Sequence, residues 1–165
     1  MPNNLETQIG ELLRVRGLTL ASAESCTGGL IGHRITNIPG SSEYYIGGVV
    51  AYAYEAKVAL LGVNWDTLHA HGAVSAETVL EMARGARKAL CADIAVSVSG
   101  IAGPGGAMPG KPVGTVWVGL AAPDGEWARH FCFDGGREQN KASSAEEALK
   151  FVLEYLETGN GIFPK

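Results

Sequence analysis

The segment LTLASAESCTGGLIGHRI, residues 18–35, is the most informative for the fold, because an apolar run is followed by a short polar segment and then by a helical pattern. Leu18–Ala23 predicts a short buried strand, and residues 30–35 have the apolar spacing of an amphipathic helix. The polar segment AESCTGG, residues 23–29, therefore joins a strand to a helix. Polar side chains at such a joint are candidates for chemistry.

Ser25 lies at this joint, near the predicted start of the helix. The unpaired backbone N–H groups of a helix N-terminus stabilise negative charge. A serine there can be a nucleophile with its oxyanion site beside it, or it can only cap the helix. Cys26 shares the location, and a thiol at a helix N-terminus can have a lowered pKa and be the nucleophile instead. The local sequence leaves these roles open.

The composition predicts a single globular domain, residues 1–165, with enough chain to bury a core. The formal net charge of −4 gives no basic footprint for nucleic acid. The first residues contain no apolar signal-peptide core, and no apolar stretch has the length needed to cross a bilayer. We therefore expect a soluble cytoplasmic protein that binds neither nucleic acid nor membrane.

The cysteines and histidines argue against a disulfide framework and a metal site. Cys26, Cys91 and Cys132 are odd in number, far apart and without Cys-x-x-Cys spacing. The four histidines match no metal-ligand motif. We expect no bound metal.

Helical and strand patterns alternate along the rest of the chain. Asn3 and Glu6 predict a capping box, which begins a helix that ends at Gly17. Pro123-Asp124-Gly125-Glu126 predicts the turn of an antiparallel hairpin. The further strands are predicted at 44–53, 94–98, 113–121 and 127–133, and the further helices at 54–61, 75–90 and 138–157. This alternation predicts a three-layer α/β sandwich with a mostly parallel sheet and one reversed strand.

The segments that follow the predicted strands converge on one crevice. Ligands of such sheets collect at the carboxyl ends of the strands. Ser25 follows the first strand, and the glycine- and proline-rich loop Gly100–Pro112 follows the third. We expect both to line the same crevice.

Lys57 is the candidate base for Ser25, because no histidine lies beside a plausible acidic partner. It comes just past the carboxyl end of the second strand, and burial lowers a lysine pKa enough to leave the amine neutral. The alternative is a solvated lysine paired locally with an acid such as Glu55. Tyr52 can hydrogen-bond the base or the leaving group, or can be a strand aromatic.

Five segments of the sequence resemble the CinA C-terminal domain family, and they occur in the right order between about residues 5 and 156. They are AESCTGG at 23–29, YAYEAK at 52–57, HGAVS at 71–75, SGIAGP at 99–104 and KPVGTV at 111–116. The active members of this family are nicotinamide-nucleotide amidohydrolases.

The resemblance implies an α/β/α sandwich on a five-stranded mixed sheet. It also implies hydrolysis of the carboxamide of nicotinamide mononucleotide to nicotinate mononucleotide and ammonia, without a cofactor. By motif, Ser25 is the nucleophile, Lys57 the general base and Tyr52 the supporting residue. For contacts to the substrate and its phosphate we expect Thr27, Gly28, Gly29, Gly103 and Arg137.

Two positions depart from the family pattern. Tyr54 stands where relatives often have asparagine. Its larger side chain either narrows the substrate pocket or has a packing role. Lys141 stands four residues after Arg137, where the family often shows a second arginine, and a lysine lacks the bidentate fork of that side chain. Longer relatives add an N-terminal domain with pyrophosphatase activity, which we do not expect from these 165 residues.

Some members of the family lack activity, so other functions stay open. A cysteine amidohydrolase using Cys26 is one alternative. A second is a non-catalytic nucleotide-binding module that uses the Gly28 and Gly103 loops as phosphate cradles. A third is a protein-interaction domain, which follows from the link of the family with competence and DNA damage. The small size and apolar content favour a homo-oligomer.

Overall fold

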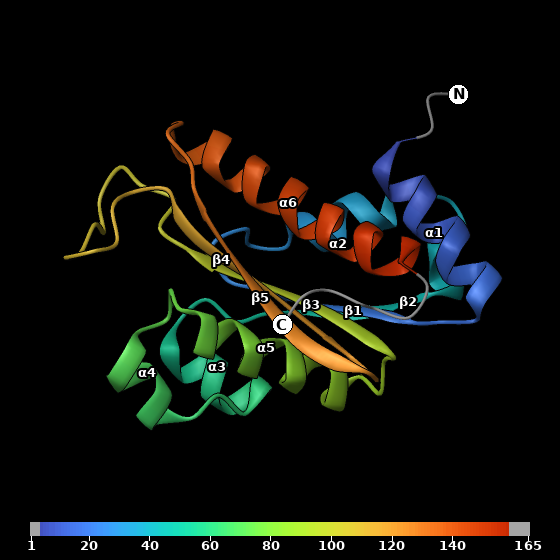
Figure 1. Cartoon of the computed structure of the whole chain (residues 1–165), viewed down its shortest axis with the longest axis horizontal. Helices are drawn as coiled ribbons and strands as arrows, with labels where there is room; N and C mark the ends of the chain where they lie inside the picture. Colours follow the sequence, from blue (N-terminus) through green and yellow to red (C-terminus); the bar gives the residue numbers. More distant parts are fainter. Residues whose placement is uncertain (1–3, 159–165) are drawn as a thin grey trace.

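The computed structural model describes residues 4–158, which form a five-stranded sheet in the order β2-β1-β3-β4-β5 (Figure 1). β1 pairs in parallel with both β2 and β3, whereas β4 runs antiparallel to β3 and β5. The reversed strand is therefore β4, and the predicted mixed sheet is confirmed. The strands are β1 Leu20–Glu24, β2 Tyr45–Val50, β3 Ile94–Gly100, β4 Thr115–Ala122 and β5 Gly125–Cys132.

Helices cover both faces of the sheet, which confirms the predicted three layers (Figure 1). One face carries α1 Leu5–Arg16, α2 Leu30–Thr36 and α6 Arg137–Glu157. The other face carries α3 Tyr54–Leu61, α4 Trp65–His71 and α5 Ala76–Ala89. All of β1 is buried, because both of its faces are covered; this explains the apolar residues Leu20, Ala21 and Ala23, and the strand also buries Ser22 and Glu24.

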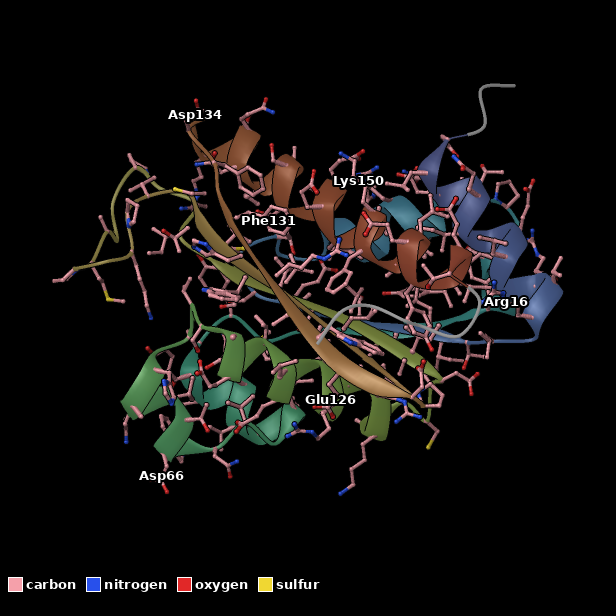
Figure 2. All side chains as sticks on the ribbon, in the orientation of Figure 1. Arg16, Asp66, Glu126, Phe131, Asp134 and Lys150 are labelled. Carbon is pink, nitrogen blue, oxygen red and sulfur yellow. The ribbon has the colours of Figure 1, made fainter. Side chains whose placement is uncertain are left out.

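The core consists of two apolar clusters, one on each side of the sheet. Alternate residues of β1 and β3 enter the two clusters: Leu20 and Ile94 belong to the first, and Ala21 and Ala95 to the second. Polar side chains point outward, as Asp66 of α4 and Lys150 of α6 do in Figure 2. Among residues 4–158 the helices are too short or too polar to cross a membrane.

Two local features differ from the sequence prediction. The predicted cap Asn3 lies outside the described residues; the observed N-cap of α1 is Asn4, whose side chain accepts from the Thr7 N–H, while Glu6 pairs with Arg34. The prediction also assigned no element to α4. This helix has a single buried side chain, Leu68, so its sequence carries almost no apolar periodicity.

The carboxyl ends of β1, β2 and β3 lie at the same edge of the sheet, because these strands are parallel and adjacent. Backbone hydrogen bonds tie the segments that leave them: Ser25 N–H donates to the Val98 carbonyl at 3.0 Å, and Ala51 N–H to the Glu24 carbonyl at 2.9 Å. The first residues after β1 and β2 are thereby fixed side by side.

Candidate active site

Ser25 and Lys57, 32 positions apart in the sequence, meet at this edge. Ser25 is the first residue after β1, and Lys57 lies in the first half of α3. The distance between Lys57 Nζ and Ser25 Oγ is 2.9 Å. Lys57 is only 1% exposed and Ser25 7%, so the contact is shielded from solvent. The structure thus brings together the two residues expected to be nucleophile and base.

Backbone carbonyl groups, and no acid, surround the Lys57 amine. Its Nζ lies 2.9 Å from the carbonyl oxygens of both Ala51 and Tyr52. None of the ion pairs within residues 4–158 includes Lys57, so the alternative of a local pair with Glu55 is not observed. Burial lowers the pKa of Lys57 to about 8. A substantial fraction of this lysine is therefore neutral in mildly alkaline solution.

A tight turn carries the chain from Ser25 to the start of α2. The Gly28 N–H donates to the Ser25 carbonyl at 3.1 Å. Gly28 and Gly29 have φ values of 60° and 106°, a left-handed region that other residues rarely adopt. The two glycines of the AESCTGG segment are therefore needed for the conformation of the turn, and their contact with a substrate stays a prediction.

The Glu24 carboxylate lies at the N-terminus of α2. The sequence predicts that the backbone N–H groups there are unpaired and close to Ser25. Its buried carboxylate accepts from the backbone N–H groups of Ile31 at 2.9 Å and Gly32 at 3.1 Å. Ser25 does not cap this helix either, since the N-cap is Gly29. The prediction of free N–H groups in the first turn of α2 was wrong, because the residue before Ser25 supplies their acceptor.

Cys26 is buried between the sheet and α6. Burial raises the pKa of the Cys26 thiol to about 11, so the thiolate is almost absent near neutral pH. The lowered pKa that a helix N-terminus can confer is not found, because the effect of burial on the thiol outweighs the influences that lower its pKa, and the charge of Glu24 raises it further. These observations favour Ser25 over Cys26 as the nucleophile.

Tyr52, Arg137 and Gly103 form a chain of contacts at the rim of the site. Arg137 donates through Nη1 to the Gly103 carbonyl at 2.7 Å and through Nη2 to the Tyr52 hydroxyl at 3.2 Å. The Tyr52 side chain is 62% exposed, and this residue reaches Lys57 through its backbone carbonyl. Gly103 and Arg137 are therefore connected to the Ser25–Lys57 pair through Tyr52.

A family model described as CinA C-terminal domain matches residues 2–156. The chain belongs to the CinA C-terminal domain family. It is 53% identical over 156 residues to a CinA-like protein of Chloroherpeton thalassium and 52% identical over 146 residues to one of Salinibacter ruber. These alignments cover 92% and 88% of this chain, but only 37% and 35% of the relatives. The chain thus spans little more than a third of the length of these curated relatives.

Solved structures of the CinA superfamily have the same fold. Competence damage-inducible protein A of Klebsiella pneumoniae superposes with a TM-score of 0.91 at 37% identity, covering 94% of this chain and 96% of that one. The competence/damage inducible protein CihA of Agrobacterium tumefaciens gives a TM-score of 0.81 at 41% identity, covering 91% and 96%. The names of these proteins state no reaction.

Asn140, which the sequence analysis did not single out, and Tyr54, which it did, hold segments around this site in place. Asn140, 1% exposed, donates through Nδ2 to the carbonyls of Ala102 and Gly135 and thereby ties the Gly103 loop to the start of α6. Tyr54 packs near Trp65, and its hydroxyl accepts from the Ala73 N–H at 3.3 Å, which fits the packing role. The sequence signal for Asn140 was its polar side chain at a position on the buried side of α6.

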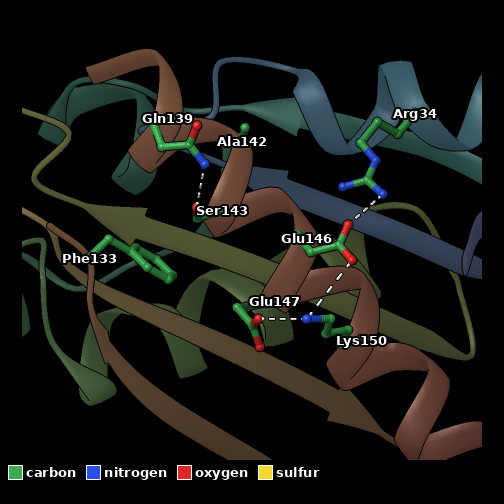
Figure 3. Close-up of a pocket in the computed structure, with 8 residues that line it drawn as sticks. All are labelled: Arg34, Phe133, Gln139, Ala142, Ser143, Glu146, Glu147 and Lys150. Carbon is green, nitrogen blue, oxygen red and sulfur yellow. Dashed lines mark hydrogen bonds and ion pairs between the residues drawn. The ribbon is translucent and has the colours of Figure 1, made fainter. Parts of the chain in front are cut away.

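Other concave or metal-ligating features lie elsewhere. Among residues 4–158 no cluster of three or more histidine, cysteine, aspartate or glutamate side chains is arranged to hold a metal. A hollow of about 410 Å³ beside α6 includes neither Ser25 nor Lys57 in its lining (Figure 3). Its charged groups pair with one another, Arg34 with Glu146 and Lys150 with Glu147. Within residues 4–158, the candidate site is therefore the Ser25–Lys57 pair.

Proposed function

We propose that this domain hydrolyses the carboxamide of nicotinamide mononucleotide to nicotinate mononucleotide and ammonia, with Ser25 as nucleophile and Lys57 as general base. The observation that carries the proposal is the 2.9 Å contact between Ser25 Oγ and the buried Lys57 Nζ. The choice of substrate rests on the resemblance of the sequence to the nicotinamide-nucleotide amidohydrolases of the CinA family.

The surroundings of Lys57 suit a general base. In the neutral amine, two N–H groups donate to the carbonyls of Ala51 and Tyr52, so the lone pair faces the Ser25 hydroxyl. Lys57 takes the hydroxyl proton as Ser25 Oγ attacks the carboxamide carbon. The resulting ammonium has three acceptors within 2.9 Å, which stabilise it without a carboxylate.

The remaining steps are those of acyl transfer. Attack gives a tetrahedral intermediate whose oxyanion needs hydrogen-bond donors. The backbone N–H groups of Cys26 and Thr27, which directly follow Ser25 in the turn, are suited to this role by their position. Lys57 returns the proton to the departing nitrogen, the C–N bond breaks, and ammonia leaves. Water, deprotonated by Lys57, then cleaves the acyl-enzyme and restores the Ser25 hydroxyl.

Two cationic side chains near the site are suited to bind an anionic nucleotide. Arg137 presents its guanidinium beside Tyr52 and Gly103, and Lys141 follows one helical turn later on α6. We propose that these cations hold the phosphate, with Lys141 as a point charge rather than a bidentate fork. No metal or organic cofactor enters the mechanism. The partner is then a small nucleotide rather than a nucleic acid.

Incubation of the purified protein with nicotinamide mononucleotide tests the proposal. We expect ammonia and nicotinate mononucleotide to be formed in equal amounts. An ammonia assay measures the first product and chromatography the second. If the nucleotide raises the melting temperature without being converted, the domain is a binding module. If it is neither converted nor bound, the choice of substrate is overturned.

The pH dependence of the reaction should follow the ionisation of Lys57. A general base must be unprotonated, so the active fraction falls tenfold for each pH unit below its pKa. Because burial lowers the Lys57 pKa to about 8, kcat/KM should rise tenfold per unit below pH 8 and level off above it. A range from about pH 7 to 9.5 lies above the second ionisation of the phosphate, near 6. A profile that is flat over this range would contradict Lys57 as the base.

A further inference from the structure

Glu24 is a buried carboxylate that takes no part in the proposed proton transfers. It ends β1, immediately before Ser25, and is 2% exposed. Its oxygens accept three hydrogen bonds: from the backbone N–H groups of Ile31 and Gly32, and from the Thr27 hydroxyl at 2.6 Å. A buried charge is costly unless it is fully hydrogen-bonded, so a carboxylate at this position needs this arrangement of donors.

The three hydrogen bonds of Glu24 connect helix α2 to the turn that follows Ser25. Two of them fix Glu24 to the backbone of α2, whose N-terminus favours a negative charge. The third holds the Thr27 side chain, which is itself 2% exposed. Thr27 lies in the middle of the turn, between Ser25 and Gly28. The orientation of this turn is therefore set by a carboxylate anchored outside it.

We propose that Glu24 and Thr27 are a positioning pair, which aims the Cys26 and Thr27 N–H groups at the oxyanion formed when Ser25 attacks. The inference rests on the proposed serine chemistry and specifies how its oxyanion site is built. It gives Thr27 a different role from the expected contact with substrate: its hydroxyl donates to Glu24. The pair acts through the backbone, so it should affect the transition state and leave substrate binding unchanged.

Thr27→Val tests this role, because it removes the hydroxyl, keeps the shape of the side chain and leaves the bonds of Glu24 to α2. We expect kcat with nicotinamide mononucleotide to fall about 10- to 100-fold, the range for a misplaced oxyanion donor, while KM changes less than about threefold. The midpoint of the pH profile should stay near 8, since the contacts of Lys57 are untouched. Thr27→Ser restores the hydroxyl and should recover most of kcat.

Thr36→Val is the matched control. Thr36 is the last residue of α2; it is exposed, and its hydroxyl donates to the Gly32 carbonyl at 2.8 Å, away from the turn that holds Thr27. Its loss should leave kcat within about twofold of the wild type. If Thr27→Val instead raises KM at unchanged kcat, Thr27 contacts the substrate and the proposal is overturned.

Labelling of Ser25 by a fluorophosphonate separates this inference from the choice of substrate. The reagent transfers its phosphonyl group to the serine oxygen as the P–F bond breaks; fluoride leaves, and Lys57 takes the hydroxyl proton. It needs the same oxyanion donors but requires no nucleotide recognition. We expect Thr27→Val to be labelled about 10- to 100-fold more slowly than the wild type, even if nicotinamide mononucleotide is not a substrate. Equal labelling rates for the two proteins would overturn the positioning role.

Discussion

Ser25→Ala is expected to lower ammonia release from nicotinamide mononucleotide by about 10⁴-fold or more, because it removes the hydroxyl that forms the acyl-enzyme in the proposed mechanism. The change removes one oxygen atom from a buried site, so the fold should be retained. The same assay of ammonia and nicotinate mononucleotide measures the loss. Nucleotide affinity, measured by calorimetry, should change little, since Ser25 Oγ contacts Lys57 and is not expected to hold the phosphate.

Cys26→Ala is the neighbouring control for that experiment. Its thiol is buried, and its pKa of about 11 leaves it un-ionised at the pH of the assay. We expect this variant to keep most of the activity. The reverse pattern, with an active Ser25→Ala and an inactive Cys26→Ala, would identify the domain as a cysteine amidohydrolase.

Lys57→Met should have the second-largest effect, a loss of at least about 10³-fold in kcat. Methionine fills a similar volume with no ionisable group, so the hydroxyl of Ser25 loses its proton acceptor. The small residual rate should no longer show the rise toward pH 8 that we expect from the wild type. A pH series of initial rates measures both effects.

The control for Lys57→Met is Lys150→Met, which removes an exposed lysine of α6 that pairs with Glu147 at 3.0 Å. Its activity should equal that of the wild type. If the two lysine variants retain the same activity, the proton acceptor is a different group.

The layers, the mixed sheet and the meeting of Ser25 with Lys57 could be predicted from the sequence, and each has a simple physical basis. β1 is fully buried because it is covered on both faces, which fits its apolar residues Leu20, Ala21 and Ala23, and parallel strands bring their carboxyl ends to one edge. Residues that follow adjacent parallel strands must then be neighbours. This rule places two positions 32 residues apart within reach of each other.

The environment of each side chain could not be predicted in this way. The acceptors around Lys57 are the main-chain carbonyls of Ala51 and Tyr52, and no residue type encodes the direction of a carbonyl group. General rules on helix ends indicated unpaired N–H groups beside Ser25. Instead, the carboxylate of Glu24, at the end of β1, accepts their hydrogen bonds. The short helix α4 escaped prediction because a single buried leucine gives no period.

The buried amine of Lys57 also ties folding to proton release. Its pKa falls from 10.5 to about 8 on folding, so between these values the unfolded chain binds more protons than the native one, and native stability increases as the pH rises. Below pH 8 both states are protonated and the native state bears the full penalty, roughly 3 kcal/mol at this depth of burial. At neutral pH the native state is thus less stable because of the buried amine that the proposed mechanism uses as its base.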